Sequence, residues 1–323
     1  MRLWDDEIEA LRPAIESEAQ SFIEAFVSAR REPDAANATR AERVARHRAA
    51  MEAMTFASDA GRDRMINGPG GALRLRVFQP EGPARAVMLH IHGGGWVVGR
   101  PEVSDRVNEF VCTSAQVAVV SVDYRLAPEH PYPAALDDCE AAATWLLANA
   151  AREFGSERLL IGGESAGGHL SAATLLRMRD RHRAASRFVG ANLVFGAYDL
   201  GRLPSQRGVG ARPDILTPEE MEFFLDLFTP GLDPEARRDA AISPLYADLS
   251  GLPPALFTVG TADHLLDDTL LMAARWSVAG NPTELLVYPG APHGGIGLPS
   301  VGAHWFPRML DFIARCAHRS AQM

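Results

Sequence analysis

The chain has 323 residues, enough for one large domain with its own core, and its 47% hydrophobic and 23% charged content is typical of a globular protein. All 32 basic residues are arginines, and the net charge of −9 argues against a nucleic acid or an anionic membrane surface as a partner. No apolar run approaches the roughly 18 residues that a membrane-spanning helix needs, so no span is predicted.

The N-terminus, Met1-Arg2-Leu3-Trp4-Asp5-Asp6-Glu7, is too acidic and too weakly apolar for a secretion signal. Cys112, Cys139 and Cys316 are odd in number and widely spaced, and they form neither a disulfide nor a metal-binding pattern. We therefore expect a cytoplasmic protein without a metal site. The sequence leaves the oligomeric state open between a monomer and a homodimer.

Residues 1–57 are predicted to be helical. A break is expected at Glu32-Pro33-Asp34, and an Arg-rich helix follows through Met54. Two interpretations remain open, a helical extension packed on the core and part of a lid over a pocket. The helical spacing is carried by Leu11, Ile15, Phe22, Ile23, Phe26 and Val27.

From Arg62 onward the apolar period changes to two, and a hairpin is predicted from 62–66 and 73–78 around the Gly-rich loop 67–71. Apolar strands then alternate with helices. This pattern predicts an α/β fold, with a mainly parallel sheet covered on both faces and an antiparallel edge. The expected strands are 86–91, 117–122, 159–161, 189–195, 255–259 and 284–288, and the expected helices are 103–113, 137–149, 170–176, 265–278 and 305–318.

One segment, from Asp199 to about Ser243, interrupts this alternation. Thr217-Pro218-Glu219-Glu220 predicts a helix start, with Thr as the N-cap, Pro in the first turn and Glu at the third position. The aromatic residues that follow are consistent with ordinary core, but insertions between strands of such sheets also form lids. We favour the lid.

The chain is organised around Gly163-Glu164-Ser165-Ala166-Gly167, a G-x-S-x-G turn between a predicted strand and a predicted helix. Such a turn lifts the serine hydroxyl clear of the sheet and places it at a helix N-terminus, which favours developing negative charge. Ser165 is therefore the candidate nucleophile. The alternative is a Gly-rich turn that contains a serine by chance.

Three further segments supply what a serine nucleophile needs. In His92-Gly93-Gly94-Gly95-Trp96, consecutive glycines allow bare N–H groups to point into one small volume, where they and the N–H of Ala166 could bind an oxyanion. No Lys-Ser/Thr pair or G-x-G-x-x-G spacing supports a phosphate-binding loop instead. Asp263 and His293 each lie in a loop after a predicted strand, where catalytic residues of open α/β sheets collect.

The order Ser165, Asp263, His293 is that of α/β hydrolases. Among the other histidines, His90, His169 and His318 are interpreted as structural, because they fall in a strand or within helices. His264 adjoins Asp263, so the two side chains are not expected to face each other. Asp267 and Asp268 fall in the first turns of a predicted helix, where carboxylates interact with the helix N-terminus.

Together these segments, with Asp123-Tyr124-Arg125-Leu126-Ala127-Pro128-Glu129-His130-Pro131, resemble the hormone-sensitive-lipase-like α/β hydrolases, called family IV among bacterial esterases, over about residues 60–320. The resemblance implies a cofactor-free carboxylesterase acting on small esters of short to medium acyl chains, in which Gly94, Gly95 and Ala166 supply the oxyanion N–H groups. It also implies an α/β-hydrolase catalytic domain over 58–323, with a helical cap from 1–57 and the insertion at about 200–240.

The chain departs from the family pattern at Glu164, where Asp or Thr is usual, and at Gly295, where an aromatic residue is usual. Neither change removes a reacting atom, but both bear on substrate preference. Two alternatives to ester hydrolysis remain, an amide or lactone hydrolase with the same triad and a non-catalytic ligand receptor. Such receptors lose the catalytic histidine, and this chain retains His293.

Overall fold

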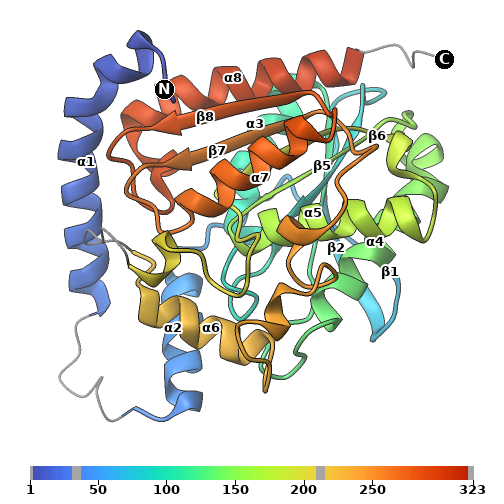
Figure 1. Ribbon diagram of the computed structural model, residues 1–323. Helices are drawn as coiled ribbons and strands as arrows, with labels where there is room; N and C mark the ends of the chain where they lie inside the picture. The colour runs from blue at the N-terminus through green and yellow to red at the C-terminus, as the bar shows by residue number, and fades with distance from the viewer. Residues whose placement is uncertain (1–2, 31–37, 209–214, 319–323) are drawn as a thin grey trace.

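The computed structural model describes residues 3–30, 38–208 and 215–318, so the break expected at Glu32-Pro33-Asp34 lies outside the described residues. Eight strands form one sheet in the order β1-β2-β4-β3-β5-β6-β7-β8 (Figure 1). Only β1 and β2 run antiparallel to their neighbours, which confirms the predicted parallel sheet with an antiparallel edge. The strands are β1 (Arg62–Gly68), β2 (Gly71–Phe78), β3 (Val87–Ile91), β4 (Ala118–Val122), β5 (Leu159–Glu164), β6 (Phe188–Val194), β7 (Ala255–Gly260) and β8 (Thr283–Tyr288).

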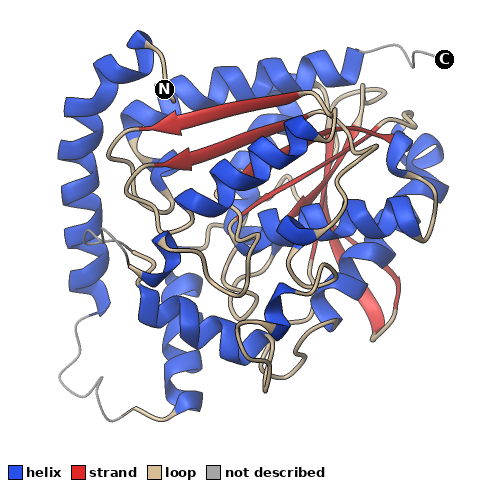
Figure 2. Cartoon of the chain, in the orientation of Figure 1, coloured by secondary structure: helices blue, strands red, loops and turns tan. Residues whose placement is uncertain are grey.

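Helices cover both faces of the sheet, as Figure 2 shows. One face packs against α3 (Asp105–Ala115) and α8 (Pro299–His318), and α1 (Asp6–Arg30) lies against α8. The other face packs against α4 (Ala134–Phe154), α5 (Ala166–Asp180) and α7 (Leu266–Val278). Every residue of β3, β4 and β7 is buried, which explains why these strands are continuous apolar runs. Within the described ranges, no helix is long and apolar enough to cross a membrane.

Several helix boundaries differ from the sequence prediction. The helix expected at 305–318 begins earlier, at Pro299, and contains Pro307. Proline is favourable in the first turn of a helix but usually breaks a helix interior, so the sequence pattern did not indicate the first six residues. The helix expected at 103–113 begins with the 3₁₀ turn Pro101–Ser104 and continues to Ala115.

The helix start predicted in the insertion is confirmed. In α6 (Pro218–Phe228), the Thr217 side chain accepts a hydrogen bond from the Glu220 N–H, and the Glu220 carboxylate accepts one from the Thr217 N–H, each at 3.2 Å. This reciprocal cap satisfies two N–H groups that the helix leaves unpaired. The buried face of the helix includes the aromatic residues Phe223, Phe224 and Phe228.

Helix α2 (Arg40–Met54) lies beside α6, although about 165 residues separate them in sequence (Figure 1). The Arg43 guanidinium lies 3.8 Å from the centroid of the Phe223 ring, and the His47 ring contacts Phe224 at 5.1 Å. Arg48 donates to the carbonyl groups of Val97 and Ala127, at 3.1 Å each. These contacts attach α2 to α6 and to the loops that follow β3 and β4.

Candidate active site

Ser165 lies in a strained turn between β5 and α5. Its φ of 57° and ψ of −119° fall outside the regions that residues with side chains usually adopt. The turn passes very close to β3, since a Cβ atom added at Gly163 or Gly167 would lie 2.1 or 1.9 Å from the Ile91 carbonyl oxygen. The two glycines of G-x-S-x-G are therefore required by backbone contact, and the turn aims the serine away from the sheet.

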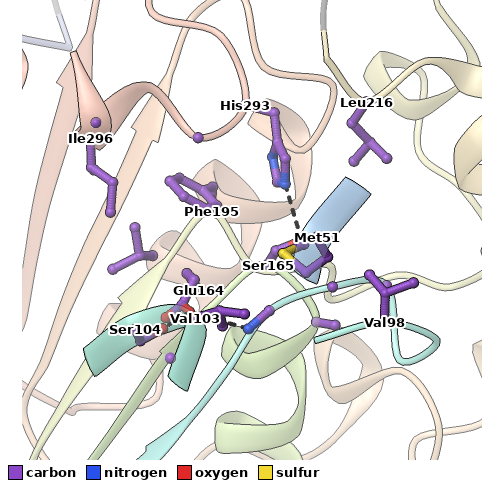
Figure 3. Close-up of a pocket in the computed structure, with 18 of the residues that line it drawn as sticks. Met51, Val98, Val103, Ser104, Glu164, Ser165, Phe195, Leu216, His293 and Ile296 are labelled. Carbon is purple, nitrogen blue, oxygen red and sulfur yellow. Dashed lines mark hydrogen bonds between the residues drawn. The ribbon is translucent and has the colours of Figure 1, made fainter. Parts of the chain in front are cut away.

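The structure brings Ser165, Asp263 and His293 together, and Figure 3 shows the hydrogen bond between His293 and Ser165. Nε2 of His293 lies 3.0 Å from Oγ of Ser165, and its Nδ1 lies 3.1 and 3.0 Å from the two carboxylate oxygens of Asp263. Asp263 is buried, and its Oδ1 also accepts a hydrogen bond of 2.8 Å from the Leu265 N–H. The loops after β7 and β8 thus place a carboxylate and an imidazole next to the hydroxyl that the turn after β5 carries.

The neighbouring carboxylates have other partners. Asp267 accepts a hydrogen bond from the Ser205 N–H. Asp268 is fully buried and accepts hydrogen bonds from the N–H groups of Tyr198 and Asp199 and from the Gln206 amide. Both residues do lie in the first turn of α7, as expected, and both also fix the segment that follows β6. Burial raises the pKa of Asp268 to about 7.

Gly94, Gly95 and Ala166 line the same cavity as Ser165. Within the described part of the chain, the N–H groups of Gly94 and Gly95 donate to no other group. Ala166 is the first residue of α5, so its N–H has no partner inside the helix. Unpaired N–H groups at a helix N-terminus and in a Gly-rich turn form a site for a developing negative charge.

Glu164, one of the two departures from the family pattern, braces this turn. Its Oε1 accepts hydrogen bonds from the Gly93 N–H at 3.2 Å and from the Ser104 hydroxyl at 2.8 Å, and its Oε2 lies 3.1 Å from Nε2 of His90. Burial alone would raise the pKa of Glu164. The nearby His90 and the three hydrogen bonds outweigh burial and hold that pKa at about 2. Glu164 is therefore an ionised carboxylate beside the nucleophile.

The prediction that His90 is merely structural missed this contact. Nδ1 of His90 lies 2.9 Å from the Ser121 hydroxyl and 3.3 Å from the Asn108 amide nitrogen, so both ring nitrogens have partners. The missed signal was the alternation within β3, which turns His90 toward α3 and toward the same sheet face as Glu164.

His169 does have a structural contact, since its Nδ1 accepts a hydrogen bond of 3.1 Å from the Trp96 indole N–H. Its Nε2 lies 2.7 Å from the Ile242 carbonyl oxygen, which links α5 to the insertion. Burial lowers the pKa of His169 to about 4, so the ring is neutral at pH 7. His318 is the last residue of α8.

The second departure, Gly295, lies in a crowded turn. A Cβ atom there would lie 2.9 Å from Cβ of Ala291, so a larger residue requires the loop carrying His293 to move. Phe22 of α1 lies on the other side of this loop, 3.9 Å from the position of a Cβ at Gly294. The loop is therefore packed against its own residue Ala291 and lies near Phe22 of α1.

A cavity of about 420 Å³ opens around Ser165. On one side it is lined by Met51, Leu216 and Val98, and Figure 3 shows Phe195, Ile296 and Val103 on the opposite side. The lining is mostly apolar, as is usual for small-molecule sites. Within the described ranges, no group of three or more His, Cys, Asp or Glu side chains is placed to hold a metal ion.

A family profile described as alpha/beta hydrolase fold matches residues 88–296. The carboxylic ester hydrolase LipN of Mycobacterium tuberculosis is 35% identical over 246 residues, which are 74% of this chain and 65% of LipN. The carboxylesterase NlhH of the same organism is 40% identical over 228 residues, 67% of this chain and 68% of NlhH. The crystal structure of a hormone-sensitive lipase from a metagenome library superposes with a TM-score of 0.77 at 28% identity, covering 93% of this chain and 98% of that one.

The chain belongs to the α/β hydrolase family, in its hormone-sensitive-lipase-like branch of carboxylesterases. The matched segment of this carboxylesterase-family chain begins in β3 and includes Ser165, Asp263 and His293. The two helices α1 and α2 lie before it. The chain spans just under two thirds of the length of LipN.

Proposed function

We propose that the protein is a serine carboxylesterase in which Ser165, His293 and Asp263 form the catalytic triad. The observation that carries the proposal is the position of the His293 ring, 3.0 Å from Ser165 Oγ on one side and 3.0 Å from the Asp263 carboxylate on the other. Asp263 accepts a hydrogen bond from the Nδ1–H group, which leaves Nε2 unprotonated and able to act as a base toward the serine hydroxyl.

In the proposed reaction, His293 takes the proton of Ser165 while Oγ attacks the ester carbonyl. The N–H groups of Gly94, Gly95 and Ala166 stabilise the oxyanion of the tetrahedral intermediate. His293 then protonates the departing alcohol, and an acyl-enzyme remains on Ser165. Water, deprotonated by His293, attacks the acyl group and releases the acid, which restores the serine hydroxyl.

Short- to medium-chain acyl esters are the proposed substrates, because the cavity is mostly apolar and limited to about 420 Å³. We further propose that residues 1–57 and the insertion at about 200–240 form a cap over a catalytic domain of residues 58–323. Met51 of α2 and Phe224 of α6 line the cavity, and Phe224 lies so close to Gly95 that a Cβ there would be 2.7 Å from its ring. The cap therefore contacts the oxyanion turn directly.

The decisive experiment follows p-nitrophenol release from p-nitrophenyl esters of increasing chain length. We expect a burst that matches the enzyme concentration, followed by slower turnover, as for an acyl-enzyme. Ser165→Ala should fold normally and lose several orders of magnitude in kcat. A serine-reactive organophosphonate should label Ser165 alone, and a label mapped elsewhere contradicts the assignment.

Amide or lactone hydrolysis uses the same groups, and parallel assays with p-nitroanilides and lactones compare these reactions with ester hydrolysis. Ligand binding without turnover would identify a receptor. A cytoplasmic location and a homodimer stay predictions, and size-exclusion chromatography with light scattering tests the dimer.

A further inference from the structure

The cavity continues from Ser165 along the sheet face that α3 and α8 cover. Figure 3 places Phe195, Ile296 and Val103 on this side, away from Met51 and Leu216. We call this part the inner arm. Its apolar lining consists of Met88, Val107, Val111, Val194, Trp305 and Met309.

The floor of the inner arm is set by strand register. The parallel pairing of β3, β5 and β6 aligns His90, Gly162 and Asn192 in one row across the sheet. Glu164 and Val194 lie on the same face, two residues further along their strands. The row therefore lies about 7 Å further from Ser165 along the strands than Glu164 does. Position 162 has room for glycine alone, because a Cβ there would lie 2.6 Å from the Asn192 carbonyl oxygen and 2.7 Å from Met88 Cε.

Asn192 differs from the other polar residues of this face. The side chains of Ser104, Asn108 and His90 all take part in the hydrogen-bond network around Glu164. Asn192 lines the cavity and is only 6% exposed, yet its Oδ1 is buried without a hydrogen-bond partner among residues 3–30, 38–208 and 215–318. A buried amide oxygen that accepts no hydrogen bond is unfavourable. Oδ1 of Asn192 therefore requires a hydrogen-bond donor from outside the described chain.

We propose that the inner arm binds a branch of the ester that carries a hydroxyl group, which donates a hydrogen bond to Oδ1 of Asn192. Oδ1 is an acceptor, so a hydroxyl fits it, whereas a carbonyl at the same position has no hydrogen to donate. The apolar lining binds the carbon chain between this hydroxyl and the ester group. The inference rests on the proposed esterase function and adds a substrate class to it, the hydroxylated esters. A site built to bond a polar group rejects the analogue that lacks it.

The test compares kcat/KM for matched hydroxylated and alkyl esters. One series has p-nitrophenyl hexanoate and its hydroxy derivatives at successive carbons, which places the hydroxyl on the acyl branch. The other has acetate esters of hexanol and of hexanediols, which places it on the alcohol branch. We expect one position in one series to exceed its alkyl counterpart by about 10- to 100-fold.

Asn192→Leu, which keeps the side-chain size and removes the amide, should abolish this preference. Met88→Leu is the matched control, since it changes the same arm without changing its polarity and should retain the preference. Asn192→Thr and Asn192→Val differ only in a hydroxyl and a methyl group, and they provide a second comparison if the leucine variant does not fold. Thermal unfolding monitors the fold of each variant.

The acetyl group of p-nitrophenyl acetate is too short to reach the row of Asn192 and carries no hydroxyl, so turnover of this ester serves as the reference for the catalytic groups. If the parent protein does not hydrolyse this ester or any other, the esterase proposal fails. If acetate is hydrolysed but hydroxylated and alkyl esters react alike, the inner-arm proposal is overturned. A preference that Asn192→Leu leaves unchanged also overturns it, and indicates that an ordered water alone bonds to Asn192.

Discussion

Replacing Glu164 by alanine tests how the oxyanion turn is held. The carboxylate accepts hydrogen bonds from Gly93, Ser104 and His90, and Glu164→Ala removes all three acceptor contacts. The Gly93 N–H immediately precedes the two N–H groups proposed to bind the oxyanion. We therefore expect the variant to bind substrate but to stabilise the transition state poorly.

The magnitude follows from the contacts that remain. Loss of one oxyanion donor lowers kcat by about 10²- to 10³-fold in comparable sites. Here the turn is still fixed by bonds from the Val97 and Val98 N–H groups to the Gly94 carbonyl, at 3.1 and 3.0 Å. Misalignment should therefore be partial, with kcat about 10- to 100-fold lower and KM changed less than about threefold. The unpaired buried groups should also lower the free energy of unfolding by about 1–3 kcal/mol.

Glu164→Gln is the matched control, because it removes the charge and keeps the shape. Its amide oxygen can still accept from Gly93 and Ser104, while its amide nitrogen donates to His90 in the other tautomer. We expect both kcat and the acylation rate, measured as the burst rate with p-nitrophenyl acetate, to stay within about fivefold of the parent. A folded Glu164→Ala with an unchanged burst rate would refute the bracing role. Equal losses in both variants would assign the effect to charge instead of geometry.

Other predictions concern the carboxylates and the cap. Asp263→Asn should lower kcat about 10⁴-fold near neutral pH, because the amide favours the wrong imidazole tautomer. Asp267→Asn is the control and should keep most of the turnover. A larger loss of kcat in Asp267→Asn than in Asp263→Asn, measured in steady-state assays, would contradict the triad. Since Asp268 has a pKa of about 7 in the folded chain against an ordinary value of 3.8, the folded chain retains a proton that the unfolded chain has lost, and the unfolding free energy should fall as pH rises from about 4 to about 7. Denaturant titrations should show that Asp268→Asn removes this slope. Deleting residues 1–35 should lower the melting temperature, because α1 packs against α8. Phe26→Ala should mainly change the relative rates with esters of different acyl-chain length, because Phe26 lines the cavity. If these relative rates stay unchanged, α1 is not part of the cap.

The fold was predictable because its signals are local. The buried strands are short apolar runs such as 118–122, and the helix of the insertion has a complete capping sequence. The candidate triad could be located for the same reason, since Asp263 and His293 directly follow the last two strands and the carboxyl ends of parallel strands share one edge of the sheet. Helix boundaries were less predictable near proline, because proline is tolerated in a first helical turn but breaks most helix interiors. The helix that contains Pro307 is an example.

The environment of each polar group was not predictable, because it depends on which residues of distant strands are neighbours. Asp268 looked like an ordinary acidic residue in a first helical turn, and only the folded chain brings Gln206 to it. His90, Gly162 and Asn192 are separated by 72 and 30 residues in sequence, and register alone aligns them. A shift of one residue in β6 would turn Asn192 to the opposite face and place an apolar neighbour, Ala191 or Leu193, toward the cavity. The chemistry of the inner arm therefore depends on the pairing of three strands, whereas that of the triad depends on two loops and one turn.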